Sequence, residues 1–225
     1  RLWKACDAQV GDDFQINPEE IEAKYFGVLT KIFNVARFAS QFPVPEMEQH
    51  PELAPEDRWL LAEFSAVLDT VQSGYAAIDI FRGGQALKQF GTGLFPSHWL
   101  EMAKQRLYSG DASAIWTLHR ALHDLLVMLS PICPFFCHYL SETLYDRSAV
   151  EERDFPAPPL GELATGTPEG DRLRGLTAAL VEFNSATWKS KKDAGLSLAA
   201  EIAGIAVPEA LAEFSDALQA MHRLA

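Results

Sequence analysis

Cysteine is scarce in this 225-residue sequence, which contains only Cys6, Cys133 and Cys137. An odd number without framework spacing argues against a set of disulfides, so we expect reduced thiols and a reducing compartment. No apolar run approaches the roughly 18 residues that a membrane span needs. No basic segment followed by an apolar one opens the chain, as a secretory signal would require. These absences predict a cytoplasmic protein with no membrane partner.

Basic residues are also few, because 19 lysines and arginines face 31 acidic residues, for a net charge of −12. This balance argues against a nonspecific nucleic-acid binder, which is normally basic. Residues 82–120 are the exception, with a net charge of +3 and five bases: Arg82, Lys88, Lys104, Arg106 and Arg120. They form either a local basic surface that guides a polyanion or a solvated helix face.

Almost every segment with apolar periodicity has the helical repeat. Residues 18–41 place Ile21, Tyr25, Val28, Ile32 and Val35 at spacings of four and three. The same signal predicts helices over 56–74 continuing through 75–89, and over 96–108, 112–129 and 135–145. Four glycines near the end of the 75–89 helix and just after it are expected to mark a kink or break: Gly83, Gly84, Gly91 and Gly93. The fold class predicted is all-α, an antiparallel helical bundle with a small C-terminal helical extension.

We expect four parts along the chain. Residues 1–17 begin as if inside a helix, without a capping residue, and are interpreted as the end of a connection from an upstream domain. The bundle covers 18–148, and 149–170 is a loop or linker rich in proline and glycine. The extension covers 171–225, with helices expected over 168–192 and 208–224, and the apolar run 202–207 fits one short strand.

The polar face of the 18–41 helix carries the most suggestive group of side chains. Lys31, Asn34 and Phe38 are expected on one line with Arg37 beside it. Lysine would meet a phosphate, asparagine a base edge, and a lone phenylalanine would offer a stacking platform to an unpaired nucleotide. Alternatively, Phe38 packs under a neighbouring loop and the other side chains are solvated.

Two other groups have a structural explanation. His119 and His123 are four residues apart on a predicted helix, but no third ligand completes the pattern of a metal site. Cys133, Cys137 and His138 lie in an apolar context that favours packing. We expect neither a metal site nor a catalytic residue in this chain.

Several motifs carry a family resemblance over nearly the whole chain. Residues 31–38, Lys-Ile-Phe-Asn-Val-Ala-Arg-Phe, look like the Lys-x-x-Asn-x-x-Arg-Phe segment of valyl-tRNA synthetases. Residues 57–61, Asp-Arg-Trp-Leu-Leu, and 99–108, Trp-Leu-Glu-Met-Ala-Lys-Gln-Arg-Leu-Tyr, resemble two later helices of that family. Residues 131–135, Pro-Ile-Cys-Pro-Phe, are similar to the turn that follows. The chain therefore resembles the C-terminal anticodon-binding region of this class I synthetase family.

The resemblance implies a tRNA partner and a parent enzyme that activates valine with ATP, while the region itself needs no cofactor. It makes Arg37 and Phe38 the leading candidates for base contact, followed by Lys31 and Asn34, with Lys104 and Arg106 as candidates for phosphate contact. The His-Ile-Gly-His signature of the class I active site is absent. Residues 189–192, Lys-Ser-Lys-Lys, superficially resemble the class I lysine loop, but they lie after the bundle and lack its methionine, so no catalytic role is assigned.

Two alternative functions are also compatible with the sequence. The same domain occurs in isoleucyl enzymes, which share single elements of the pattern. A helical protein-interaction module without RNA binding would also fit the composition. The bases of 82–120 and the Lys31–Phe38 face should converge on one groove if RNA is bound there, and should point to different sides if it is not.

Overall fold

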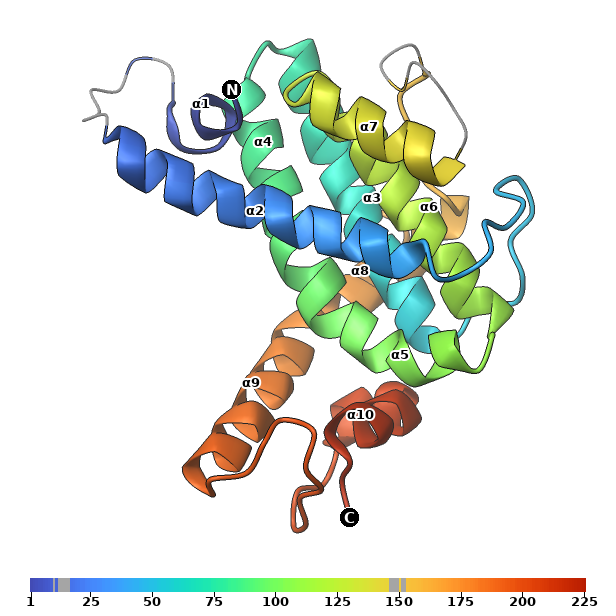
Figure 1. The fold of residues 1–225 in the computed structure, drawn as a ribbon. Helices are drawn as coiled ribbons and strands as arrows, with labels where there is room; N and C mark the ends of the chain where they lie inside the picture. The colour runs from blue at the N-terminus through green and yellow to red at the C-terminus, as the bar shows by residue number, and fades with distance from the viewer. Residues whose placement is uncertain (10, 12–16, 146–149, 151–152) are drawn as a thin grey trace.

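A computed structural model describes the chain except residues 10, 12–16, 146–149 and 151–152. Figure 1 shows a helical molecule, as predicted, and the described part contains no β-sheet. Its α-helices are α1 (Leu2–Asp7), α2 (Pro18–Ala39), α3 (Pro55–Ala76), α4 (Ile80–Gln89), α5 (Leu100–Tyr108), α6 (Ala112–Leu129), α7 (Pro134–Tyr145), α8 (Pro168–Gly175), α9 (Thr177–Asp193) and α10 (Ser215–His222). A π-helix (Phe90–Trp99) joins α4 to α5, and short 3-10 helices span Gly161–Leu163 and Glu209–Phe214.

The antiparallel arrangement follows the connections between helices. In Figure 1, α3 runs upward, α4, the π-helix and α5 return downward, and α6 runs up again beside α3. The return after α5 is a tight turn in which Gly110 has φ +79°, a conformation that glycine adopts without steric cost. Asp111 then caps α6 by accepting a hydrogen bond from the Ala114 amide at 2.8 Å. The predicted start and end of this helix are confirmed.

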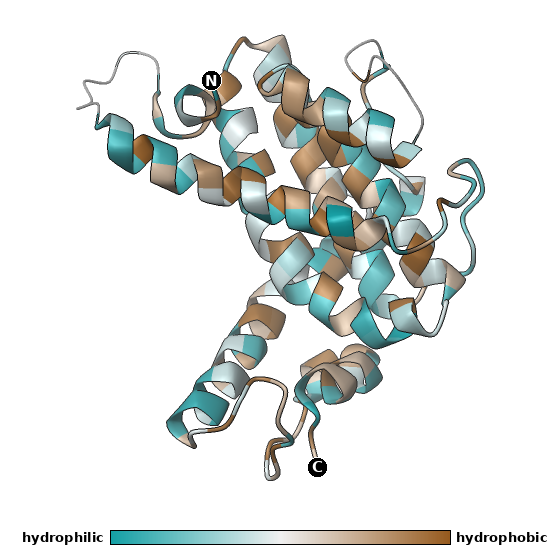
Figure 2. Cartoon of the chain, viewed as in Figure 1, coloured by the Kyte–Doolittle hydropathy of each residue, from teal (hydrophilic) through white to brown (hydrophobic). Residues whose placement is uncertain are grey.

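The core lies between α3 and α6. Trp59, Leu60, Leu61 and Phe64 of α3 are fully buried, and most residues of α6 are buried as well. Figure 2 shows hydrophobic residues gathered in the middle of the bundle, whereas the far end of α9 is largely hydrophilic. Helix α6 is apolar on most of its circumference, so it acts as the central helix rather than as a surface helix with one apolar stripe.

Helix α2 begins with a capping asparagine and a proline. The Asn17 side chain accepts from the Glu19 amide at 3.2 Å and from the Glu20 amide at 3.5 Å, and Pro18 occupies the first turn. Tyr25, Ile32 and Val35 of the predicted apolar stripe are buried. Figure 1 shows that α2 crosses the front of the bundle, over α4 and towards the end of α5.

The predicted break at the glycines of residues 83–93 is confirmed in part, because α4 ends at Gln89 and a π-helix that contains Gly91 and Gly93 follows it. A further break, which the sequence did not predict, lies at residues 77–79, where Ile78 has φ +58° and the Asp79 amide donates to the Gly74 carbonyl at 2.8 Å. Gly83 and Gly84 instead lie inside α4, and a Cβ atom added to Gly84 would overlap the Ala5 carbonyl of α1. These glycines therefore permit close helix packing, and Gly91 and Gly93 lie in the π-helix.

The C-terminal extension differs from its prediction in three places. The expected helix over 168–192 is two helices that meet at Leu176, and the expected helix over 208–224 starts as a 3-10 turn before α10. The expected strand over 202–207 is reduced to a single parallel bridge between Ile202 and Leu224. A strand needs a partner strand along its length, and among the described residues Ile202 forms a bridge with Leu224 alone.

Lys191 organises this extension from its centre. Its side chain is fully buried, and its ammonium donates to the carbonyls of Leu198, Ala200 and His222 at 2.8, 2.8 and 2.7 Å. The Lys191 ammonium thus supplies hydrogen bonds to carbonyls of both the last turn of α10 and the loop after α9. None of the described helices combines the length and apolarity that crossing a membrane requires.

Candidate nucleic-acid interface

The predicted polar face of α2 borders the seam between α2 and the segment from the π-helix to α5. We call this the α2–α5 seam and define it by Lys31, Asn34, Arg37, Phe38 and Tyr108. The Lys31 ammonium donates to the Thr92 carbonyl of the π-helix at 3.4 Å. Phe38 meets Tyr108, the last residue of α5, with ring centroids 5.8 Å apart. The polar line therefore flanks a helix–helix contact rather than lying opposite the core.

Asn34 and Arg37 offer free hydrogen-bonding groups on this seam. Both side chains are exposed, and within the described part of the chain no hydrogen bond or ion pair holds either one. An exposed guanidinium presents donors in a planar fork that suits a phosphate or a base edge. An amide presents both a donor and an acceptor. The two residues lie three positions apart on α2, so they project from one side of the helix.

The prediction of a lone aromatic on a polar face was wrong for Phe38. Its ring is half-buried, packs against the core and makes edge contacts with Phe42 at 5.2 Å and Tyr108 at 5.8 Å. The alternative interpretation, in which Phe38 packs beneath neighbouring residues, describes its surroundings better. The apolar periodicity predicted which side of α2 carries Phe38. It contained no information about the rings that pack against Phe38, because Phe42 and Tyr108 lie outside this helix.

Tyr108 is the exposed aromatic residue of this cluster. Its side chain is 65% exposed, although its ring packs on Phe38 and lies 6.1 Å from Phe42. Two neighbouring rings thus hold one edge of Tyr108 while leaving most of it open to solvent. The sequence did not identify Tyr108 as a site residue, although it ends the Trp-Leu-Glu-Met-Ala-Lys-Gln-Arg-Leu-Tyr motif. Its position at the end of a predicted helix was the only available signal.

The two predicted phosphate contacts differ in their surroundings. The Lys104 ammonium pairs with Glu101 one turn away at 2.8 Å, and about 43% of its side chain is exposed. The Arg106 guanidinium contacts Glu56 at 2.5 Å, Asp57 at 2.6 Å and Asp111 at 2.7 Å, and its side chain is 22% exposed. Three carboxylates offset the charge of Arg106, so it acts within the fold and is not retained as a phosphate-contacting candidate.

The basic character of residues 82–120 is largely neutralised by the fold. Lys88 pairs with Asp7 at 2.9 Å and Arg120 pairs with Asp124 at 2.5 Å, while Lys104 and Arg106 have the partners given above. Only Arg82 of the five bases has no ion pair among the described residues. The local excess of positive charge in the sequence therefore does not produce a continuous basic surface, and any polyanion contact must depend on individual side chains.

The predicted structural role of the histidine pair fits the packing. His119 is buried with its Nδ1 atom 3.4 Å from the Tyr145 hydroxyl, and burial lowers its pKa to about 4. His123 contacts Asp124 at 2.9 Å. No cluster of three metal-ligating side chains was found in the described part of the chain. Both histidines are thus accounted for by contacts inside the bundle.

Comparison with known proteins adds an independent observation. A family model described as the anticodon-binding domain of tRNA ligase matches residues 57–205. A valine–tRNA ligase from Pyrobaculum aerophilum is 33% identical to this chain over 234 residues, and one from Haloarcula marismortui is 32% identical over 226 residues. The first match covers 100% of this chain and 28% of the relative, and the second covers 99% and 24%. The chain thus spans about a quarter of the length of these relatives.

Proposed function

We propose, because the chain belongs to the family of anticodon-binding domains of tRNA ligases, that it recognises the anticodon stem-loop of a valine tRNA. The whole protein would then be a valine–tRNA ligase of the cytoplasm, which activates valine with ATP and transfers it to that tRNA. The valine–tRNA ligases that this chain resembles favour the valine branch over the isoleucine branch. Adenylate chemistry belongs to a separate catalytic part, so the role of this chain is discrimination between tRNAs.

The observation that carries the proposal is the composition of the α2–α5 seam. Arg37 and Asn34 present unpaired polar groups on α2, the helix whose Phe38 packs against the exposed ring of Tyr108. Proteins read single-stranded RNA by stacking its bases on aromatic or guanidinium planes and by hydrogen bonding to the base edges. In this proposal Tyr108 supplies the stacking surface, Arg37 and Asn34 supply the hydrogen bonds, and Lys31, earlier on α2, supplies a cation on the same seam.

Phe38 contributes to this surface indirectly. Its ring supports Tyr108 from the side at an interplanar angle of 85°. An aromatic ring that is already held by its neighbours loses little conformational freedom when a base stacks on it. We therefore assign Phe38 a positioning role, with Phe42 behind it, and assign the base contact to Tyr108.

Electrostatics set the expected strength of binding. A net charge of −12 and a basic segment whose cations are mostly paired make a poor platform for long-range attraction of RNA. Affinity must therefore come from short-range stacking and hydrogen bonds, with a modest dependence on salt. The 225-residue chain alone should bind tRNA weakly, and binding should depend on the anticodon bases.

Replacement of Tyr108 tests the stacking surface. Tyr108→Ala should weaken binding of a valine-tRNA anticodon stem-loop about 5- to 100-fold, since one base stacked on an aromatic ring contributes about 1–3 kcal/mol. Tyr108→Phe keeps the ring and should bind nearly as well as the unaltered chain. The measurement is a fluorescence titration with a labelled stem-loop at two salt concentrations.

A stem-loop with replaced anticodon bases is the control ligand. The unaltered chain should bind it more weakly than the valine stem-loop, whatever the effect of Tyr108. Equal affinity for the two stem-loops would contradict the proposed function itself. Equal loss of affinity in Tyr108→Ala and Tyr108→Phe would instead exclude stacking and leave only the hydroxyl as a contact.

A further inference from the structure

A buried polar network joins the C-terminal extension to the bundle. The Asn184 side chain of α9 lies between two histidine rings. Its Nδ2 group donates to Nδ1 of His98 in the π-helix at 3.0 Å, and its Oδ1 atom accepts from Nε2 of His222, the last residue of α10, at 2.7 Å. Asn184 and His222 are fully buried, and His98 is 9% exposed. We call these three residues the His–Asn–His network, because one amide links three segments that are far apart in the sequence.

Aromatic rings surround the network on the side of the extension. The centroid of the Trp188 ring lies 5.6 Å from that of His98 and 5.8 Å from that of His222, and the Phe183 ring lies 5.8 Å from His222. Figure 1 shows α10 beside α5, which follows the π-helix, while α9 extends away from the bundle. The network therefore lies in a largely apolar contact between the extension and the bundle.

The hydrogen bonds fix the protons of both histidine rings. Because His98 accepts at Nδ1, its ring proton is on Nε2, and because His222 donates from Nε2, its neutral ring has none on Nδ1. A proton added to Nδ1 of His98 would face the amide NH2 group, donor against donor. A proton added to Nδ1 of His222 would lack an acceptor, since this atom is buried without a hydrogen-bond partner among the described residues. Rotation of the amide would only move the conflict to Nε2 of His222, so the network accommodates neutral rings alone.

The charged groups around the network also oppose a further positive charge. The Lys191 ammonium donates to the His222 carbonyl at 2.7 Å, and Arg223 follows His222 directly in the chain. The acidic residues of α5, α9, α10 and the 3-10 helix before α10 are ion-paired with other residues or exposed to solvent: Glu101, Glu182, Asp193, Glu209, Glu213 and Asp216. A proton on the His222 ring would thus add a second buried positive charge near Lys191.

We propose that the His–Asn–His network is a proton-sensitive latch. While both histidines are neutral, it holds α9 and α10 against the π-helix and α5, and when either histidine binds a proton the extension is released. The latch goes beyond tRNA recognition and does not depend on it, because the network contains no residue of the α2–α5 seam. Release would free one side of α5, the helix that ends at Tyr108, so acid would loosen the support of this helix without altering the seam itself.

The latch should respond below about pH 6.5. Burial, and next the Lys191 ammonium, lower the pKa of His222 from 6.5 to about 4, and burial lowers the pKa of His98. Histidines of a released extension have ordinary pKa values, so the released state binds protons more readily than the docked one. Docking is therefore strongest above pH 6.5 and weakens as the pH falls towards 4. For His222 alone, the ratio of released to docked extension should rise about 10- to 30-fold from pH 7 to pH 5.

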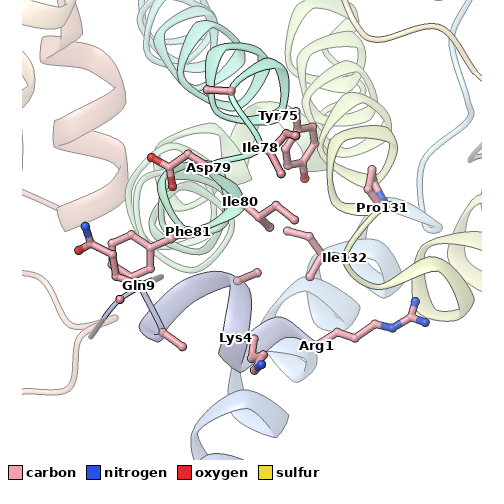
Figure 3. Close-up of a pocket in the computed structure, with 14 residues that line it drawn as sticks. Arg1, Lys4, Gln9, Tyr75, Ile78, Asp79, Ile80, Phe81, Pro131 and Ile132 are labelled. Atoms are coloured by element: carbon pink, nitrogen blue, oxygen red, sulfur yellow. The ribbon is translucent and has the colours of Figure 1, made fainter. Parts of the chain in front are cut away.

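Hydrogen exchange at pH 7 and pH 5 measures this release without RNA. The Ile202 amide donates to the carbonyl of Arg223, beside His222, at 3.1 Å, so it reports on the end of α10. Its protection factor, corrected for the chemical exchange rate, should fall about tenfold or more from pH 7 to pH 5. The Asp79 amide, which donates to the Gly74 carbonyl at 2.8 Å, is the reference. It lies at a pocket of about 1130 Å³ whose described lining residues include no histidine (Figure 3), so its protection should stay constant.

Asn184→Asp should reverse the pH dependence. A carboxylate between the rings accepts from both of them, so a proton on Nδ1 of His98 gains an acceptor in place of a facing donor. The Ile202 amide of this variant should therefore be at least as protected at pH 5 as at pH 7. His50→Gln is the matched control, because His50 is exposed on the loop after α2 and lies outside the network. Its replacement should leave the fall in protection unchanged.

Three results would overturn the latch. Constant protection of Ile202 from pH 7 to pH 5 in the unaltered chain would show that protonation does not release the extension. An equal fall in Asn184→Asp and in the unaltered chain would show that the fall arises elsewhere. Nitrogen NMR of the imidazole rings needs no substitution, so it decides the matter even where Asn184→Asp fails to fold. His222 should keep its single proton on Nε2 down to about pH 5, and a His222 that becomes charged near its ordinary pKa while Ile202 stays protected would contradict the proposal.

Discussion

Arg106→Met should lower the free energy of unfolding by about 3–5 kcal/mol, which is the usual effect of removing one partner from a buried ion pair. Arg106 joins Glu56 and Asp57 at the start of α3 to Asp111 at the cap of α6. The Asp57 carboxylate is fully buried and also accepts from the Trp99 indole at 2.9 Å. Methionine fills much of the space but leaves the carboxylates without their cation.

The loss of stability in Arg106→Met should depend on pH. Burial and the neighbouring Asp57 already raise the pKa of Glu56, and Arg106 opposes this rise. Without Arg106, the pKa of Glu56 rises further, so the folded variant takes up protons more readily than the unfolded chain as the pH falls. Proton uptake by the folded state stabilises it, so the difference between variant and unaltered protein should shrink from pH 7 to pH 5.

Lys104→Met is the matched control for this prediction. Lys104 is on the same helix and forms an ion pair with Glu101, but both side chains are more than 40% exposed. An exposed pair of this kind contributes no more than about 1 kcal/mol. Urea denaturation of both variants at pH 7 provides the comparison. Similar midpoints for the two would contradict a structural role for Arg106 and restore it as a candidate for phosphate contact.

Lys191→Met should lower the free energy of unfolding of the C-terminal extension by about 2–4 kcal/mol. The substitution leaves the carbonyls of Leu198, Ala200 and His222 without a donor, and each unsatisfied buried group costs about 1–3 kcal/mol. Relief from burying the ammonium group offsets part of this cost, since burial also lowers the pKa of Lys191. The change should therefore be concentrated in the loop after α9 and the end of α10.

Hydrogen exchange measures this local effect, and Lys189→Met is its control. Lys189 lies two residues earlier on α9 with its side chain exposed, so its replacement should change stability by less than about 0.5 kcal/mol. Amides such as Ile202 and Ala225, which bond across the bridge at 3.1 and 3.0 Å, should exchange faster only in Lys191→Met. Uniform protection in both variants would mean that Lys191 does not hold the extension together.

Local signals in the sequence predicted those parts of the fold that local interactions determine. The apolar spacing predicted α2 and α6, and the structure shows a side-chain cap at the start of each helix, Asn17 and Asp111. The break at Ile78 was missed because isoleucine has no preference for the left-handed conformation that the turn requires. Gly84, one of the glycines that suggested a break, instead allows α4 to approach α1, a contact between segments about 80 residues apart.

Long-range contacts explain the remaining differences at the candidate site. The sequence identified Arg37 and Asn34 as exposed residues of one helix side, and the structure leaves them exposed. It could not predict that Arg106 faces Glu56 and Asp57, some 50 residues away. For the same reason, the basic run of residues 189–192 did not indicate that Lys191 is buried, because the carbonyls around it belong to a later loop and to α10.

The central claim is that the α2–α5 seam reads the anticodon, and a double-mutant cycle on Arg37 tests it most directly. Arg37→Ala in the longer polypeptide should weaken binding of valine tRNA by about 5- to 100-fold, since a good contact to a base edge contributes about 1–3 kcal/mol. Binding of a valine tRNA with replaced anticodon bases should hardly change. Arg82→Ala, which removes an exposed cation on α4, should affect both tRNAs little. An equal loss for both tRNAs in Arg37→Ala would show that Arg37 does not sense the anticodon and would contradict the account.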